Sequence, residues 1–350
     1  MFRIAVDVLG GDGAPDVPIE AAIAVGKEQN VEIALLGPEE IIRDRLRRIS
    51  GTTGLAVKIV HAPRTISGSE AQVKAIRTQR DSSIVRGFEL LRSGEVDALV
   101  SAGSTGALMA GGLLIGGRMP GISRPALPVC APSVTGGRVV LLDVGVNPDA
   151  KPHHLLQYAV MGIVYSRGLL KVRDPAVYLL NIGEEEGKGN ELARAAYRLM
   201  RCSLGNAFRG NIEARDILSG KADVVVTDGF TGNVTLKCIE GVAAILFGAL
   251  KKELKATFRT KIAGILARPA FVRVKNALDY SEYGGVPLLG LNTLCIKCHG
   301  SSNAKAFANG IRVALSALES RFLDAIREGV AGLKPSEEAE EANHGDQNSD

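Results

Sequence analysis

Short apolar runs alternate with longer amphipathic stretches along most of this chain. Each run has the length of a buried strand and ends at Gly or a small polar residue, whereas the stretches between them show helical spacing. The predicted strands lie at residues 4–6, 31–36, 56–60, 96–100, 138–142, 176–180 and 223–227. This alternation indicates an α/β fold with one open, mostly parallel sheet and helices on both faces. Ligands of such sheets bind at the carboxyl ends of the strands.

The first predicted strand leads into a glycine-rich turn, D-V-L-G-G-D-G-A-P, at residues 7–15. Gly10, Gly11 and Gly13 allow backbone amides, including that of Asp12, to approach a ligand without obstruction from side chains. Such amides favour an anion. The spacing matches neither the dinucleotide-binding fingerprint nor a P-loop. An ordinary strand-to-helix loop fits the same sequence equally well.

A second turn rich in small residues, S-A-G-S-T-G-A, follows the strand at 96–100. Ser104, Thr105 and Gly106 lie where a helix is expected to begin, so their amides and hydroxyl groups suit a phosphate or an oxyanion. Tight packing of the helix against the strand is the alternative. Upstream of this turn, Ser82 and Ser83 are predicted to cap another helix.

Polar residues also follow the strands of the second half of the chain. Asp143 and Asn147 belong to the segment L-L-D-V-G-V-N. Lys188 lies in N-I-G-E-E-E-G-K-G-N, which is no P-loop but places a long cationic side chain within reach of a phosphate. A cluster of small and polar residues precedes a long helix, and packing alone is the alternative account of it. Its members are Asp228, Gly229, Thr231, Gly232 and Asn233.

The segment at 295–306 reads C-I-K-C-H-G-S-S-N-A-K-A. Its first five residues spell a c-type haem attachment motif, but haem attachment requires export and the N-terminus carries no export signal. Without a second C-x-x-C, a structural zinc site is not expected either, and we predict no metal and no cofactor. Ser301, Ser302 and Asn303 are candidate caps of a helix, and His299 beside them is a candidate proton carrier. A purely structural hydrogen-bonding role is the alternative for His299.

Composition limits the class of protein. Of the 350 residues, 46% are hydrophobic and only 4% aromatic, with no Trp and 41 Gly, which suits an aliphatic α/β core. The net charge of +4 conceals an acidic segment at 334–350, without which 41 basic and 32 acidic side chains remain. A basic body favours acidic partners such as phosphate, anionic lipid or an acidic protein. Nucleic acid is not expected, because no basic stretch is interleaved with aromatic residues.

The five cysteines are an odd number, and four of them lie in apolar runs, as reduced thiols do. The N-terminus shows no basic stretch followed by an apolar one. Both observations predict a cytoplasmic protein.

Residues 242–275 are predicted to form a pair of basic amphipathic helices. Apolar residues of this segment share one helical face at i, i+4 spacing: Val242, Leu246, Leu250, Leu254 and Phe258. Between residues 251 and 275, eight Lys or Arg residues, including Lys251 and Lys252, stand against one acid. The longest charge-free apolar run is far shorter than the roughly 20 residues of a membrane span, so we expect contact with an anionic membrane surface. A core or dimer helix with a solvated basic edge is the alternative.

Taken together, these segments resemble the bacterial phosphate acyltransferases of phospholipid synthesis, the PlsX family, to about residue 325. The most specific blocks are G-N-I-E-A-R-D-I at 210–217 and D-V-V-V-T-D-G-F-T-G-N-V-T-L-K-C-I-E at 223–240. Two positions depart from the family's pattern, since Ser104 stands where the family has Asn and Ala214 where Gly is usual. Any role of that Asn amide therefore has no counterpart here.

The resemblance implies a fold related to phosphotransacetylases and isocitrate dehydrogenases. It implies acyl transfer from acyl carrier protein to inorganic phosphate, without a cofactor, by a homodimer that contacts the membrane peripherally. It also implies that a membrane glycerol-3-phosphate acyltransferase uses the product. We expect one catalytic unit over residues 1–333, of one lobe or of two around a cleft, with a helical projection at 235–278 and a disordered tail at 334–350.

Roles for individual residues combine the resemblance with the chemistry of the segments. Proton handling or oxyanion support is expected of His299, Lys188 and Asp228. Phosphate or substrate binding is expected of Gly10, Gly11, Asp12, Ser104, Thr105, Gly106, Asp143, Asn147, Thr231, Gly232, Asn233, Ser301, Ser302 and Asn303. Three rival classes stay open: an acyl-coenzyme A phosphotransacylase, a decarboxylating dehydrogenase on a related sheet, and a non-catalytic membrane scaffold.

Overall fold

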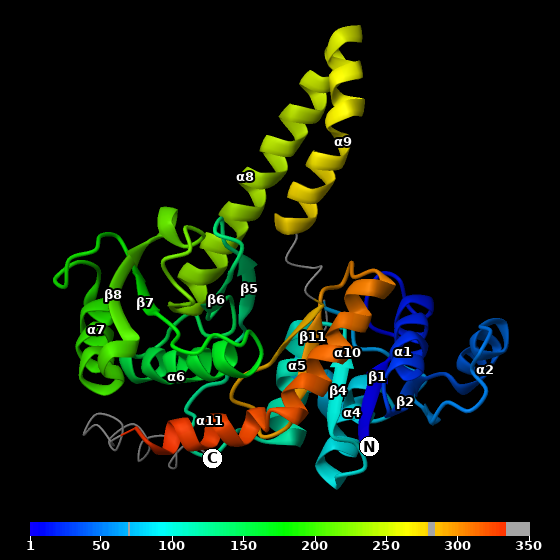
Figure 1. Ribbon diagram of the computed structural model, residues 1–350. Coiled ribbons are helices and arrows are strands. Elements are labelled where there is room, and N and C mark those ends of the chain that lie inside the picture. Colours follow the sequence, from blue (N-terminus) through cyan, green and yellow to red (C-terminus); the bar gives the residue numbers. More distant parts are fainter. Residues whose placement is uncertain (69–70, 279–283, 334–350) are drawn as a thin grey trace.

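The computed structural model describes residues 1–68, 71–278 and 284–333 as two lobes with a helical hairpin that projects from them (Figure 1). Each lobe is built on one sheet. The acidic segment at 334–350, for which disorder was predicted, lies outside the described residues.

The first lobe contains a sheet of six strands in the order β10-β11-β4-β1-β2-β3. All neighbouring strands are parallel except β10, which pairs antiparallel with β11. The strands are β1 (Phe2–Asp7), β2 (Val31–Gly37), β3 (Val57–His61), β4 (Ala98–Ser101), β10 (Gly285–Pro287) and β11 (Cys295–Cys298). The helices of this lobe are α1 (Asp16–Glu28), α2 (Glu39–Arg48), α3 (Gln72–Thr78), α4 (Ser83–Ser93), α5 (Thr105–Gly111) and α10 (Ala304–Glu319).

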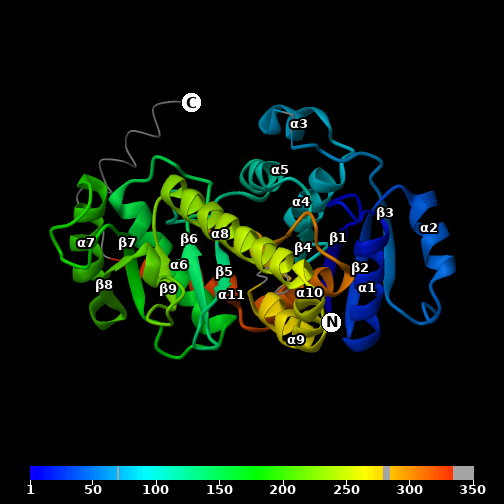
Figure 2. The same cartoon turned by 90° about the horizontal axis from the view of Figure 1, so that it is seen from above.

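The second lobe contains a sheet of five strands in the order β5-β6-β9-β7-β8, with β5 antiparallel to its neighbour. The strands are β5 (Val129–Pro132), β6 (Arg138–Leu142), β7 (Val177–Asn181), β8 (Phe208–Glu213) and β9 (Val224–Val226). Helices α6 (Pro152–Gly168) and α7 (Glu191–Leu204) pack on this lobe. From above, the two lobes lie side by side and the hairpin passes over the gap between their ribbons (Figure 2).

The last part of the chain ties the lobes together. After the hairpin, β10 and β11 join the sheet of the first lobe, α10 packs on α1, and α11 (Phe322–Ala331) packs on α6 of the second lobe. One cluster of buried apolar side chains therefore runs through both lobes, from Ile4 and Val100 to Val224 and Phe322, each at most 2% exposed. The two lobes therefore share part of their core, and each sheet packs in addition on a separate apolar cluster within its own lobe.

The predicted fold class, mostly parallel strands with helices on both faces, is confirmed, and all seven predicted strands are present. The prediction of one continuous sheet was wrong, because the strands divide between two sheets. Four strands were not predicted: β5, β8, β10 and β11. Two of them contain Pro, β10 has three residues, and β8 alternates apolar and polar residues, so none forms the long apolar run typical of a central parallel strand.

The projecting hairpin consists of α8 (Gly229–Ala256) and α9 (Phe258–Leu278). The turn between them is fixed by a reciprocal pair of hydrogen bonds: the Thr257 amide donates to Thr260 Oγ1 at 3.0 Å, and the Thr260 amide donates to Thr257 Oγ1 at 3.2 Å. The prediction that Phe258 continues the apolar face of one helix was wrong, because the chain reverses at Thr257 and Phe258 begins α9. Leu254 faces Gly264 of α9.

Much of the hairpin surface is apolar and exposed. Ile245, Leu246, Ile265 and Leu266 are between 64% and 77% exposed. Within the described part of the chain, Gly229–Ala256 is the one helix whose length and composition would suit a membrane span. No residue of its most apolar stretch of 18 residues is buried. The base of this helix, however, is packed inside the second lobe, where Gly229 and Gly232 are buried.

That base is held by direct contact between backbones. A Cβ atom on Gly229 would lie 2.8 Å from the Asn147 amide, and one on Gly232 would overlap the carbonyl oxygen of Asp143. Asp228 caps α8 by accepting a hydrogen bond from the Thr231 amide at 2.8 Å. The two glycines therefore let the start of α8 approach the 143–147 loop closely.

We predict that Gly232→Ala lowers the free energy of unfolding by about 2–3 kcal/mol, because the added methyl group has no space. Gly241→Ala is the matched control, since a Cβ on Gly241 of the same helix meets no atom within 4 Å. It should raise stability by up to about 1 kcal/mol, since alanine is the better helix former. Urea unfolding of both variants checks this, and equal effects would contradict the close approach.

Candidate functional site

Three loops converge at the carboxyl ends of the neighbouring strands β1, β4 and β11. Asp7 ends β1 and is completely buried. Its carboxylate accepts hydrogen bonds from Ser101 Oγ at 2.6 Å and from the Leu9 amide at 3.0 Å. Ser101 Oγ in turn accepts from the Gly103 amide at 3.0 Å. Burial raises the pKa of Asp7, and the hydrogen bond from Ser101 opposes that rise.

The glycines of the first turn allow this turn to lie close to the other two loops. A Cβ on Gly10 would lie 2.5 Å from the Gly103 amide. Gly11 has a φ of +90° and lies against the carbonyl oxygen of Gly300, which accepts a hydrogen bond from the Asp12 amide at 2.8 Å. The Asp12 amide is therefore engaged by the protein itself. Binding of an anion by this turn stays a prediction.

The loop after β11 carries His299 into the start of α10. The Ser301 amide donates to His299 Nδ1 at 3.2 Å, and Ser301 Oγ lies 2.8 Å from the same nitrogen. Because Nδ1 accepts from an amide, a neutral ring carries its hydrogen on Nε2. Of the three predicted caps, Asn303 is the one that caps α10, by accepting from the Ala306 amide at 2.8 Å. Ser302 is buried beside it.

Lys297 was not predicted as a functional residue. It lies on β11 between Ile296 and Cys298, which are both completely buried. Its amine donates to the carbonyl oxygens of Cys298 and, at 3.4 Å, of Ala102. Burial lowers the pKa of this amine. The available signal was a single lysine within an otherwise apolar strand, which the resemblance of the segment to a haem motif obscured.

A cavity of about 350 Å³ lies between the two lobes. Its polar end is lined by Thr105, Lys297, His299 and Gly300 of the first lobe, and Asn233 of α8 faces it from the second lobe. The structure therefore brings together three predicted residues, Thr105, Asn233 and His299, with the unpredicted Lys297. Ser104 lies next to this group and caps α5 by accepting from the Ala107 amide at 3.4 Å. Gly106 packs against Gln72.

Asp143 and Asn147 bind each other and the chain segment that crosses between the lobes. Asp143 accepts from the Asn147 amide at 2.7 Å and from the Leu127 amide at 3.0 Å. Asn147 Nδ2 donates to the carbonyl oxygen of Pro125 at 2.6 Å. Both residues hold the start of β5 and the base of α8 in place. Their predicted contact with substrate stays a prediction.

Lys188, Asp228 and Thr231 lie elsewhere. Asp228 and Thr231 line a separate pocket of about 390 Å³ at the carboxyl ends of β7 and β9, together with Asn181 and Asn190. The exposed Lys188 lies in the neighbouring loop, where its carbonyl oxygen accepts from Asn181 Nδ2 at 3.1 Å. Thr231 and Asn233 thus face different pockets from the base of one helix. The structure does not place Lys188 or Asp228 on the cavity between the lobes.

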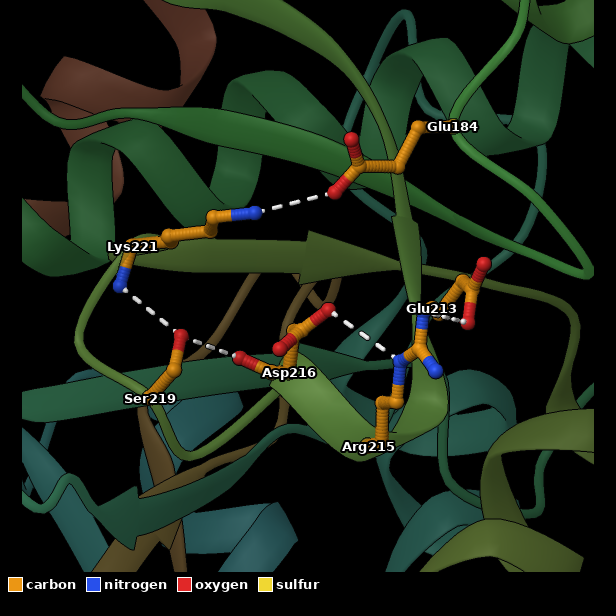
Figure 3. A network of polar contacts seen from close by, with 6 residues as sticks. All are labelled: Glu184, Glu213, Arg215, Asp216, Ser219 and Lys221. Carbon is orange, nitrogen blue, oxygen red and sulfur yellow. Dashed lines mark hydrogen bonds and ion pairs between the residues drawn. The ribbon is translucent and has the colours of Figure 1, made fainter.

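The acidic residues of the 181–190 loop form ion pairs with the second lobe. Figure 3 shows Lys221, which donates to Glu184 at 2.9 Å, and Arg215, which lies 3.0 Å from Glu213. The hydrogen bond between Lys221 and Glu184 raises the pKa of Lys221 and lowers that of Glu184. Glu186 pairs with Arg201 at 2.6 Å. These exposed pairs orient the loop but contribute little stability.

The two-lobed arrangement is that of the phosphotransacetylases. A phosphotransacetylase from Streptococcus pyogenes superposes with a TM-score of 0.60 at 19% sequence identity, covering 91% of this chain and 94% of that one. A phosphotransacetylase from Staphylococcus aureus gives a TM-score of 0.57 at 16% identity, covering 91% and 94%. At these identities the likeness defines the fold, and the predicted relation to this fold is confirmed.

Sequence comparison defines the family. A family model described as "Fatty acid synthesis protein" matches residues 2–324. Phosphate acyltransferase of Pelotomaculum thermopropionicum is 47% identical over 333 residues, 95% of this chain and 96% of that protein. Phosphate acyltransferase of Oceanobacillus iheyensis is 46% identical over 337 residues, 96% of this chain and all of that protein. The chain belongs to the phosphate acyltransferase family, as its motifs predicted, and is an acyltransferase of that family.

The raised pKa of Asp7 predicts a pH dependence of stability. The native state binds the Asp7 proton more tightly than the unfolded state does, so protonation of Asp7 stabilises the fold. This stabilisation is complete below the ordinary pKa of 3.8 and is lost as the pH rises through the raised native pKa. Asp7→Asn stays neutral. Its unfolding free energy relative to the wild type should therefore rise above about pH 4, by up to roughly 1.4 kcal/mol per pH unit.

Urea unfolding between about pH 3 and pH 8 measures this difference. Ser101→Ala removes the hydroxyl group that donates to Asp7 and should extend the range of pH over which stability falls. A difference that does not change with pH would mean that Asp7 titrates as an ordinary carboxyl group.

Proposed function

We propose that this protein transfers an acyl group from acyl carrier protein to inorganic phosphate and releases an acyl phosphate. The observation that carries the proposal is the cavity between the lobes, whose lining combines hydrogen-bond donors, Lys297 and His299 among them, with a larger number of apolar side chains. Such a cavity suits a substrate with one reactive polar group and a hydrocarbon tail. Relatives named phosphate acyltransferase and the family description of fatty acid synthesis support the same reaction.

The reaction requires positioning rather than a covalent enzyme intermediate. A phosphate oxygen forms a bond to the carbonyl carbon of the thioester, the carbonyl oxygen carries negative charge in the intermediate, and the C–S bond then breaks. We assign stabilisation of that oxyanion to the Lys297 amine, which is a donor in either protonation state. The neutral ring of His299 accepts at Nδ1 and carries its hydrogen on Nε2, so it is assigned a hydrogen bond from Nε2 to the leaving thiolate. The proton that the thiolate takes up is the one that the attacking hydrogen phosphate gives up.

Acyl carrier protein is the proposed donor because the protein body is basic. Residues 1–333 carry 41 basic and 32 acidic side chains, and a basic surface attracts an acidic protein partner. Acyl-coenzyme A is the rival donor. Family membership supports acyl transfer in general, and the charge of the body supports the carrier protein in particular.

The direct test incubates the purified protein with acyl carrier protein thioester and phosphate and traps acyl phosphate with hydroxylamine. We expect a product that requires phosphate and forms much more slowly from acyl-coenzyme A. His299→Ala should lower turnover roughly 10²-fold, because a hydrogen-bond donor to the departing sulfur is lost, with little change in the melting temperature.

His61→Ala is the matched control, since His61 is exposed on β3 at the other edge of the first sheet. It should leave turnover unchanged. Turnover of His299→Ala equal to that of the wild type would assign His299 a purely structural role, and absence of any phosphate-dependent product would refute the proposed reaction.

The hairpin suits peripheral contact with an anionic membrane, and it also suits contact with a second copy of the chain. A membrane glycerol-3-phosphate acyltransferase is the proposed user of the product. Exposed Ile265 and Leu266 lie on the same helix as basic residues such as Lys261 and Arg268. Apolar side chains that enter the interface and cations that meet lipid phosphates act together, each cation contributing about 1 kcal/mol.

We predict that the double variant Ile265→Glu and Leu266→Glu loses most sedimentation with vesicles that contain phosphatidylglycerol and keeps acyl transfer in solution. Val134→Glu is the matched control, because Val134 is 81% exposed on the second lobe. A wild-type protein that does not sediment with these vesicles at low salt would show that the membrane contact is wrong.

A further inference from the structure

The apolar part of the cavity lies between two edge strands, one from each sheet. β5 is the terminal strand of the second sheet and β10 is the terminal strand of the first. Val129 and Cys130 of β5 and Val286 of β10 all line the cavity. Figures 1 and 2 show β5 on the side of the second lobe that faces the first. The apolar part of the cavity therefore runs along two strand edges, and we call it the seam.

The seam continues between two helices. Tyr165, Leu169 and Leu170 line it from the end of α6, and Val313 lines it from α10. Tyr165 and Cys130 are at most 5% exposed, so this part lies deep within the molecule. Burial raises the pKa of Cys130 to about 11, and the cation of Arg138, which also lines the cavity, opposes that rise. The Lys237 and Glu240 side chains that also line the cavity pair with each other at 2.8 Å.

We propose that this seam holds the acyl chain of the substrate and that its volume sets the chain length the enzyme accepts. The inference rests on the proposed function, because it places the thioester beside Lys297 and His299 and directs the hydrocarbon tail along β5 and β10. An apolar cavity of about 150 Å³ holds benzene, with six carbon atoms, so the whole cavity of 350 Å³ corresponds to about fourteen carbon atoms. The seam is only part of this cavity and therefore holds a shorter chain.

The hairpin offers a larger apolar groove, of about 1100 Å³ between α8 and α9. None of its lining residues belongs to the group around Lys297 and His299, and four of them, Lys251, Lys255, Lys261 and Arg268, are cationic. The groove begins at Ala244 of α8, so a chain bound wholly within it would place its thioester beside the hairpin rather than beside Lys297 and His299. The seam is therefore the assigned chain site, and the groove is the alternative that the experiment must distinguish.

Two lining positions permit opposite changes in volume. Val129 is half-buried on β5, and Val129→Phe places a larger side chain in the seam and so reduces its volume. Leu170 is half-buried just beyond α6, and Leu170→Ala removes three carbon atoms from the wall. Val134→Phe is the matched control for the first change, because Val134 follows the same strand but is 81% exposed. None of these residues is among the groups assigned to the reaction.

The probe is a series of alkyl phosphates with chains of increasing length, and binding is measured by calorimetry. For the wild type and for Val134→Phe we expect affinity to rise about fourfold per methylene group until the seam is full, and then to level off. Val129→Phe should level off at a shorter chain and Leu170→Ala at a longer one. Acyl transfer should shift its chain-length preference in the same directions, while the shortest donor still reacts with every variant.

The outcomes separate this inference from the proposed function. If the chain length at which affinity levels off shifts, but neither the wild type nor any variant makes acyl phosphate, the seam binds the chain and the proposed reaction is wrong. If neither seam variant moves the levelling point, the seam is not the chain site. If the levelling point moves instead on substitution of Phe247 in the hairpin groove, the chain lies there and the inference is overturned. Leu170→Ala keeps the test decisive if Val129→Phe does not fold.

Discussion

The buried carboxylate of Asp7 is the interaction on which the polar end of the site depends. Ser101 Oγ binds it at 2.6 Å and also accepts from the Gly103 amide, so one carboxyl group joins the loops after β1 and β4. The loop after β11 then adds to this pair through the hydrogen bond from the Asp12 amide to Gly300. Because a buried polar group without partners is costly, these three loops hold one arrangement, and it is this arrangement that brings Lys297, His299 and Thr105 to the same cavity.

The path of the chain explains why the site lies between two lobes. The hairpin interrupts the order of the strands, and the chain then returns through β10 and β11 to the first sheet. Residues far apart in sequence, Asn233 on α8 and Lys297 on β11, therefore line one space. The same return leaves β5 and β10 as facing strand edges. A hydrocarbon chain bound between β5 and β10 would shield these two strand edges from pairing with strands of other chains.

The sequence predicted those parts of the structure that depend on local patterns. The central strands are continuous apolar runs because helices cover both their faces, and the caps at Ser82 and Asn303 follow from local hydrogen bonding. The division into two sheets depends on contacts between distant segments, for which the pattern carries no signal. For the same reason Lys188 and Asp228 were grouped with His299, although the base of α8 separates their pocket from the cavity. A single lysine in an apolar strand was the available signal for Lys297, but its place at the cavity depends on burial beside Ala102 and Cys298, which the sequence does not reveal.

Amide hydrogen exchange with and without dodecyl phosphate shows whether the site lies between the two lobes. We predict slower exchange in the segments that line the cavity, at residues 127–132, 284–288 and 297–302, with no change at residues 244–272 of the hairpin or in the 181–190 loop. Slower exchange confined to the hairpin or to that loop, with residues 127–132 and 297–302 unchanged, would contradict this location of the site.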